Sequence, residues 1–193
     1  MRYLISGTAI ACLAHVSIAS PVPLLELLEN GRIELAPQGL GGHSGECLKV
    51  DVRNRTAAAL RTSIPAGWVF VSQVEGVQDL IVVREEAIAL APNGRTTVTC
   101  RAFCCEASSS GPGVNEPYLK GHPARETLTA LARFVDSLNY EDGIVQSAIW
   151  VLSDMHDIAS MGALDNTAAD TLRNKLSALS GQPAPRYAVR YAE

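Results

Sequence analysis

Apolar and polar residues alternate along the first half of the chain. From Leu48 to Val52 every second residue is apolar, which is typical of a strand with one buried face. Turn-forming residues, such as Pro65-Ala66-Gly67 and Pro92-Asn93-Gly94, separate further short apolar segments. The predicted strands are residues 33–35, 48–52, 60–64, 68–71, 79–83, 87–90 and 96–103. This spacing predicts an antiparallel β-sandwich over about residues 32–103.

Beyond residue 123 the apolar spacing becomes helical. The apolar residues expected inside three helices are Leu128, Leu131, Val135 and Leu138 in the first, Val145, Ile149 and Leu152 in the second, and Leu172, Leu176 and Leu179 in the third. Asp142 is expected to cap the second helix, and Asn166 or Thr167 the third. A short leucine-rich helix is also expected in residues 21–30.

These patterns predict an α+β fold. The expected divisions are a β-sandwich in residues 20–105, a helical subdomain in residues 106–182 that packs on the sandwich, and a tail in residues 183–193. The three helices are too few to bury a core of their own, so they are expected to share one with the strands.

The first 19 residues follow a different pattern. Arg2 is the only residue among Lys, Arg, Asp and Glu before Glu26, and a mostly apolar stretch follows it. Ser17 and Ala19 supply small residues at positions −3 and −1 of a cleavage site. A lipoprotein signal cut before Cys12 and a buried N-terminal segment are the other interpretations. We therefore expect a signal peptide in residues 1–19 and a secreted or periplasmic mature protein.

Composition narrows the possible partners. The 193 residues have a formal net charge of −4, and the charges are scattered without a dense basic segment, which does not favour a nucleic-acid partner. No apolar segment approaches the ~20 residues that span a bilayer. The sequence therefore predicts neither nucleic-acid binding nor a membrane-spanning helix, and it predicts no cofactor.

Four cysteines lie beyond the predicted signal peptide: Cys47, Cys100, Cys104 and Cys105. Exported proteins commonly form disulfides, and four cysteines allow three pairings. A bridge between the adjacent Cys104 and Cys105 would close a strained ring. The preferred hypothesis is a disulfide between Cys47 and one of the later three.

The glycine-rich run in residues 39–47 leads into a strand, so neither a P-loop nor a dinucleotide-binding motif fits it. It is interpreted as a tight turn before the strand at Leu48. Five residues are of the types that bind zinc: His43, Cys47, Cys104, Cys105 and His156. Their spacing matches no compact zinc-binding motif, so ordinary structural roles are preferred and no metal is predicted.

The most specific pattern is the pair formed by Phe103-Cys104 and Val145-Gln146-Ser147-Ala148-Ile149-Trp150. It resembles the motifs of bacterial thioester domains, which occur in surface adhesins and in small exported proteins. The resemblance implies a bond between the Cys104 sulfur and the side-chain carbonyl of Gln146, with loss of ammonia. Cys105 is the second candidate for the sulfur. Trp150 follows Gln146 by four residues on the same helix face and is expected to shield the bond from water.

A structural alternative stays open, in which Gln146 is a polar helix residue bonded to a backbone group and Trp150 packs in the core. Two functional alternatives also stay open. A thiol-dependent Cys–His hydrolase would use Cys104 or Cys105 as nucleophile, His122 or His156 as base, and Asp154 or Asp157 to orient the base. A structural envelope protein would use the cysteines for ordinary disulfides. The preferred function is an exported, non-catalytic binding module for an unknown surface or envelope partner, with covalent attachment through the thioester.

Overall fold

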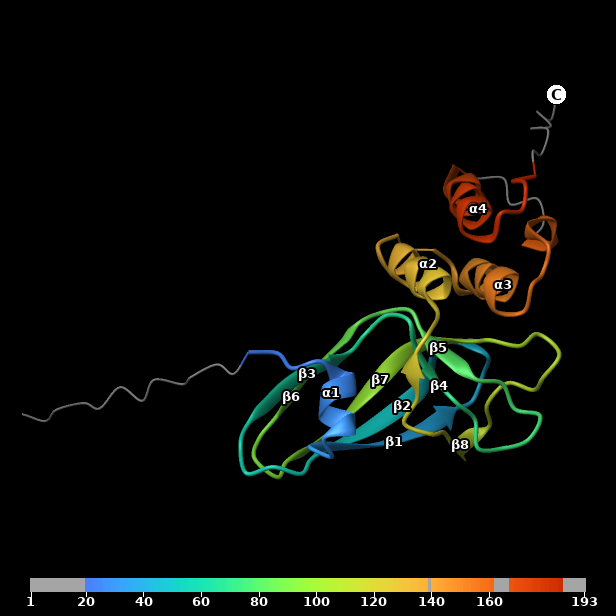
Figure 1. The fold of residues 1–193 in the computed structure, drawn as a ribbon. Helices are drawn as coiled ribbons and strands as arrows, with labels where there is room; N and C mark the ends of the chain where they lie inside the picture. Colours follow the sequence, from blue (N-terminus) through green and yellow to red (C-terminus); the bar gives the residue numbers. More distant parts are fainter. Residues whose placement is uncertain (1–19, 139, 162–166, 186–193) are drawn as a thin grey trace, which may run out of the picture.

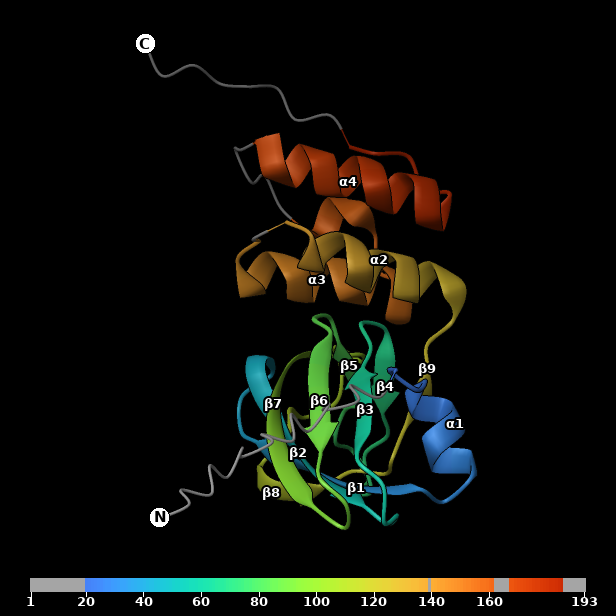
Figure 2. The same cartoon turned by 90° about the vertical axis from the view of Figure 1, so that its left-hand side faces the viewer.

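The structure is a computed structural model that describes residues 20–138, 140–161 and 167–185. The predicted signal peptide and Asn166, one of the two predicted helix caps, lie outside these residues. The chain folds into a β-structure with a stack of helices across one of its ends (Figures 1 and 2). The predicted α+β class is confirmed.

The main sheet has seven antiparallel strands and curls into a half-barrel. Its order is β8 (Val114–Pro117), β1 (Ile33–Leu40), β2 (Ser44–Asn54), β7 (Arg95–Cys104), β5 (Leu80–Val82), β4 (Trp68–Phe70) and β9 (His122–Pro123). Strands β3 (Leu60–Ile64) and β6 (Glu86–Leu90) form a separate two-stranded antiparallel sheet. The predicted sandwich therefore describes the arrangement only loosely, because one of the two sheets has just two strands.

Apolar residues of both sheets and of helix α1 (Leu24–Glu29) enclose one core, which we call the sheet core. It includes Leu27, Leu48, Val50, Leu60, Ile64, Trp68, Phe70, Leu80, Cys47, Cys100 and Cys104. Alternation along the strands produces it: β3 is buried at Leu60, Thr62 and Ile64 and more exposed between them. The short helix predicted in residues 21–30 is confirmed and contributes three buried leucines.

Strand β2 begins earlier than expected. The predicted turn in residues 39–47 is wrong in extent, because β1 continues to Leu40 and β2 starts at Ser44. The pairing of β2 with β7 shifts between Gly45 and Leu48, which is the mark of a β-bulge. Gly45 has a φ of +78°, which glycine adopts without steric cost. The bulge leaves both Cys47 and Leu48 buried.

Residues 114–123 return to the sheet at both edges. Strand β8 pairs with β1, and β9 pairs with β4. Neither strand was predicted, because four and two residues are too few to establish a period. The helical region therefore begins at α2 (Glu126–Asp136) and not at residue 123.

Helices α2 and α3 (Asp142–Ser153) lie across the end of the half-barrel, and α4 (Thr167–Ser180) lies on top of them (Figure 2). A short 3-10 helix, η1 (Ile158–Met161), follows α3. Leu138 is 39% exposed beyond the end of α2, so its predicted place on the buried face is wrong. Asp142 is the first residue of α3, whose N-cap is Glu141 without a side-chain cap hydrogen bond.

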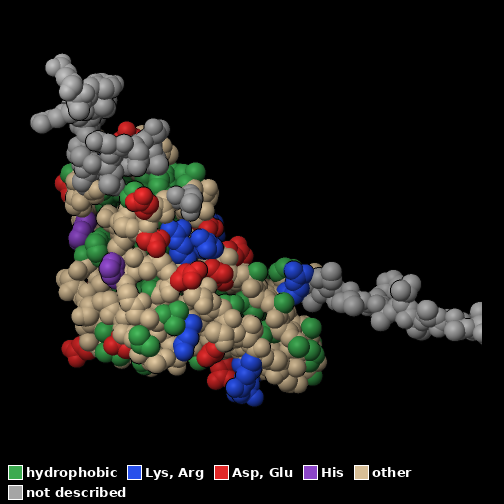
Figure 3. All heavy atoms as spheres, turned by 180° about the vertical axis from the view of Figure 1, so that it is seen from behind, with side chains coloured by type: hydrophobic (Ala, Val, Ile, Leu, Met, Phe, Trp, Pro, Cys, Tyr) green, Lys and Arg blue, Asp and Glu red, His purple; other side chains and the backbone are tan. Residues whose placement is uncertain are grey.

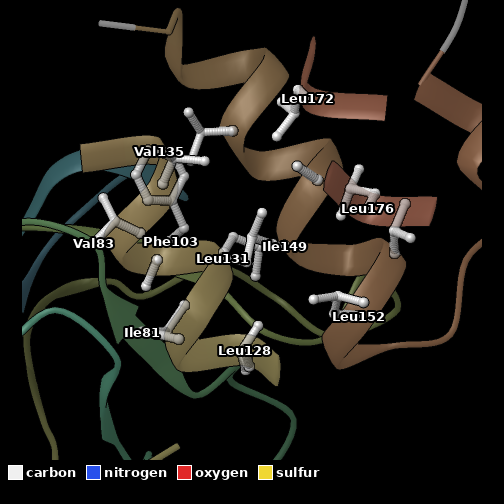
Figure 4. Packing of buried hydrophobic residues seen from close by; sticks show 14 of the residues in the cluster. Ile81, Val83, Phe103, Leu128, Leu131, Val135, Ile149, Leu152, Leu172 and Leu176 are labelled. Carbon is white, nitrogen blue, oxygen red and sulfur yellow. The ribbon is translucent and has the colours of Figure 1, made fainter. Parts of the chain in front are cut away.

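A second core, the helix core, joins these helices to the sheet (Figure 4). It includes Leu128, Leu131, Val135, Val145, Ile149, Leu152, Leu172 and Leu176 with Ile81, Val83, Phe103 and Cys105 of the sheet side. The chain between residues 103 and 105 thus contributes alternate side chains to two cores. None of the helices in the described ranges has the length and apolar character needed to cross a membrane.

Candidate functional site

Cys104 and Gln146 meet where strand β7 ends beneath helix α3. The backbone N–H of Cys104 donates to Gln146 Oε1 at 3.0 Å, and Gln146 Nε2 donates to the carbonyl of Cys104 at 2.7 Å. Both bonds are buried, and Gln146 is only 3% exposed. Two residues that lie 42 positions apart in the chain are therefore in direct contact.

The start of β2 explains why a side chain can reach the backbone here, because β2 begins at Ser44, opposite Phe103, and Cys104 lies opposite the turn before it. Phe103 pairs with Ile81 of β5, whereas the N–H and carbonyl of Cys104 take partners on the side of β2. Near the turn β2 offers only a long bond, from the Cys104 N–H to the carbonyl of His43 at 3.3 Å. The Gln146 carboxamide completes the pairing, as a peptide group of a neighbouring strand would.

The two adjacent cysteines lie on opposite sides of the strand. Cys104 belongs to the sheet core, whereas Cys105 belongs to the helix core, as the alternation of side chains along a strand requires. Cys105 is held by its backbone, since Ser153 Oγ donates to its carbonyl at 2.6 Å. Because the carboxamide bonds to the backbone of Cys104 and not of Cys105, Cys104 is the better-placed partner of Gln146.

The four cysteines are free thiols in the structure, and all are buried. The Cys47 thiol donates to the carbonyl of Ala102 at 3.2 Å. Cys100, Ala102 and Cys104 face the same core as Cys47, so the Cys47 sulfur lies over β7 between two other cysteines. The predicted pairing of Cys47 with a later cysteine stays a prediction.

Burial governs the acidity of these thiols. It raises the pKa of Cys47 to about 11 and the pKa of Cys104 to about 12. Burial likewise raises the pKa of Cys100 to about 12 and that of Cys105 well above its ordinary value. Two neighbours add to the effect at Cys104, where Cys47, once it is ionised, and the Glu106 carboxylate both oppose ionisation. At neutral pH these thiols are therefore protonated and weakly nucleophilic.

Trp150 is half-buried one helical turn beyond Gln146. Its ring centroid lies 6.0 Å from that of His156, at an interplanar angle of 42°. Its indole N–H is buried and has no hydrogen-bond partner among the described residues. The contact that the structure gives for this ring is therefore with His156, and the expected shielding of a Cys104–Gln146 bond by Trp150 stays a prediction.

The structure brings together one predicted base of the hydrolase, His156, and one predicted orienting carboxylate, Asp154. His156 Nε2 lies 3.2 Å from Asp154 Oδ2, which also accepts from the backbone N–H of Ala107. Asp157 accepts from the backbone N–H of Ala159 next to η1. His122 is exposed in β9. Within the described residues, no hydrogen bond joins either imidazole to a cysteine sulfur.

The predicted zinc-ligand types are not gathered into a site. In the described part of the chain, no group of three or more His, Cys, Asp or Glu residues is arranged to hold a metal ion. Cys104 and Cys105 point into different cores, and His156 contacts Asp154 and Trp150.

Arg101 is a residue of the site that the sequence reasoning missed. Its guanidinium donates to Asp142 Oδ1 at 2.6 Å from Nη2 and at 3.1 Å from Nε. A cavity of about 480 Å³ lies beside this pair, lined by Gly45, Glu46, Arg84, Arg101, Tyr140, Glu141 and Asp142. The signal was an arginine inside the apolar end of a strand, which indicates a buried ion pair.

Comparison with known proteins adds no relative to this description. No protein-family model matches the chain, and neither the curated proteins nor the solved structures contain a significant match.

Proposed function

We propose that the protein is an exported, non-catalytic binding module that attaches to a surface or envelope partner through a thioester between Cys104 and Gln146. The observation that carries this proposal is the buried, two-bond contact of the Gln146 carboxamide with Cys104. The resemblance to thioester domains requires a glutamine side chain beside this cysteine, and Gln146 reaches the backbone of Cys104 from α3.

The chemistry balances without a co-reactant. The Cys104 sulfur attacks Cδ of Gln146, the bond from Cδ to Nε2 breaks, and the thiol proton leaves with that nitrogen as ammonia. A partner amine then attacks the thioester carbonyl, which forms an amide and returns the thiol. Because the Gln146 carboxamide is held against the backbone of Cys104, proximity takes the place of an external catalyst.

The acidity of the thiol favours this function over the hydrolase. A hydrolase needs a thiolate at every turnover, whereas burial raises the pKa of Cys104 to about 12. A bond that forms once during maturation tolerates a small thiolate fraction, because the step has no turnover to sustain.

Intact mass spectrometry of the purified protein tests the proposal. We expect a mass about 17 Da below that calculated for the mature chain, a difference equal to the mass of the ammonia lost. Gln146→Ala and Cys104→Ala should each abolish this deficit relative to their own calculated masses, while Cys105→Ala should retain it. A full-length mass without the deficit would contradict the proposal.

A structural protein with ordinary disulfides is the second candidate, and one observation favours it. Cys47, Cys100 and Cys104 share the sheet core, and the Cys47 sulfur lies over the strand that carries the other two. The same measurement separates the candidates, because one disulfide lowers the mass by about 2 Da. Both bonds can coexist only if Cys47 pairs with a cysteine other than Cys104.

A further inference from the structure

An ion pair between the buried Arg101 and the half-exposed Asp142 links the first turn of α3 to strand β7. Arg101 bonds to the carboxylate of Asp142 through two nitrogens, and its Nη2 also donates to the carbonyl of Tyr140 at 2.9 Å. The Arg101 side chain is only 10% exposed. Its guanidinium lies 5.5 Å from the centroid of the Phe103 ring. A buried arginine with these partners has a single orientation available to it.

Strand β2 leaves room for the same carboxylate at Gly45. A Cβ atom at this position would lie 2.5 Å from Asp142 Oδ2, so a larger residue would displace the aspartate. The φ of +78° at Gly45 belongs to the bulge in β2. The lack of a side chain at Gly45 leaves the space that Asp142 occupies.

Asp142 and Gln146 are four residues apart and therefore lie on one face of α3, about one turn from each other. Their partners, Arg101 and Cys104, are three residues apart on β7, which corresponds to about 10 Å of strand. Two contacts on one helix face fix both the height and the rotation of the helix relative to the strand. The contact between Asp142 and Arg101 therefore helps to set the position of the Gln146 carboxamide relative to Cys104.

We propose that Arg101 and Asp142 are a positioning pair for the bond between Cys104 and Gln146. This inference rests on the proposed function, and neither residue touches the reacting atoms. The pair acts by limiting the motion of α3, so that the carboxamide stays against Cys104. Since proximity replaces a catalyst in this condensation, a freer helix would form the bond more slowly.

The first experiment measures the fraction of purified protein that carries the deficit of about 17 Da. Arg101→Gln and Asp142→Asn are expected to lower this fraction about tenfold. Arg84→Gln is the matched control, because Arg84 lines the same cavity but pairs with Asp136 of α2, at 3.8 Å. Near-UV circular dichroism verifies folding, and Arg101→Lys replaces any variant that does not fold. An undiminished deficit in a folded Arg101 variant would overturn the inference.

A second experiment does not depend on the thioester. Cys104→Ala keeps the backbone groups that bond to Gln146 but removes the sulfur, so the carboxamide persists in every molecule. In this background we expect Arg101→Gln to accelerate hydrogen exchange of the Gln146 carboxamide about tenfold, by nitrogen-15 NMR, and Arg84→Gln to leave it unchanged. If the native protein lacks the mass deficit, the proposed function fails. The exchange rate still tests the positioning role in that case. If Arg101→Gln leaves the exchange of the Gln146 carboxamide unchanged, the positioning role is overturned.

Discussion

Burial in a shared core determines the chemistry of the individual cysteines. Cys47, Cys100 and Cys104 lie in the sheet core, and burial is the largest cause of the raised pKa of each thiol. A neutral thiol is a small apolar group that suits such a core, whereas a thiolate does not. The thiol proton is therefore part of what stabilises the folded sheet.

Stability should consequently fall in alkaline solution. Burial raises the pKa of Cys47 to about 11 and that of Cys100 to about 12, from an ordinary value of 9.0. This stabilisation is complete below the unfolded pKa and is lost as pH rises through the folded pKa, because the unfolded chain releases the proton first. Each thiol contributes a slope of up to about 1.4 kcal/mol per pH unit above about pH 9. Urea unfolding under reducing conditions between about pH 8 and about pH 10.5 measures it.

Cys100→Ala supplies the comparison for this pH dependence. The substitution removes one titrating thiol from the sheet core, so the free energy of unfolding should fall less steeply with pH than in the native protein. The absolute stability of the variant does not enter the comparison, because only the slope is used. Equal slopes would show that the Cys100 thiol does not differ in acidity between the folded and unfolded chains.

At the scale of elements, the segment between β7 and α2 is organised by one tight turn. Gly121 has a φ of +76°, and a side chain there would overlap the carbonyl oxygen of Val69. The indole N–H of Trp68 donates to the neighbouring carbonyl of Lys120 at 3.0 Å. Strand β9 can therefore reach the edge of β4 only if residue 121 has no side chain.

Gly121→Ala and Gly31→Ala form a matched pair that tests this turn. Both glycines have a positive φ, but a Cβ at Gly31, with φ of +64°, would meet nothing within 4 Å. Gly31→Ala should cost about 1 kcal/mol of unfolding free energy from backbone strain alone. Gly121→Ala should cost about 1–3 kcal/mol more, because β4 must also move. Urea unfolding of both variants measures the difference, and equal costs would contradict the close approach of the turn to β4.

The sequence predicts elements well where a period is long enough to read. The leucine spacing predicts α2, α3 and α4, and the alternation around Val50 predicts the centre of β2. Strands β8 and β9 could not be predicted, because their partner strands β1 and β4 are distant in the sequence and their own residues show no alternation of apolar and polar positions. The helix cap at Asp142 was wrong because the long-range bond to Arg101 takes the carboxylate instead.

The residues of the candidate site also fall into two groups, those that the sequence predicts and those that only the fold reveals. Cys104 and Gln146 could be chosen from the sequence, because each lies in a short segment that resembles a known motif. Arg101 and Gly45 could not be assigned, since their roles depend on a bulge and on a contact between residues 41 positions apart. The opposite orientations of Cys104 and Cys105 follow from alternation along β7, provided that the strand is known to extend that far.

At the scale of the whole molecule, the helical stack and the half-barrel are not independent units. Strand β5 contributes Leu80 and Val82 to the sheet core and Ile81 to the helix core. Phe103 and Cys104 divide in the same way at the end of β7. Separating the helices from the sheet would expose the apolar side chains that β5 and β7 turn toward them. On the face in Figure 3, acidic and basic side chains are interspersed with hydrophobic ones.

The shared strands predict that both layers unfold together. The chain has two tryptophans: Trp68 is 1% exposed in the sheet core, and Trp150 is half-buried on α3. In the single-tryptophan variants Trp150→Phe and Trp68→Phe, the remaining fluorescence reports one layer each. For each variant, the urea transition by fluorescence should coincide with its own transition by far-UV circular dichroism. Comparison within one variant removes any effect of the substitution on stability. If Trp150 fluorescence changed at a lower urea concentration than the circular dichroism, the helices would unfold from an intact sheet, and the two cores would be energetically separate.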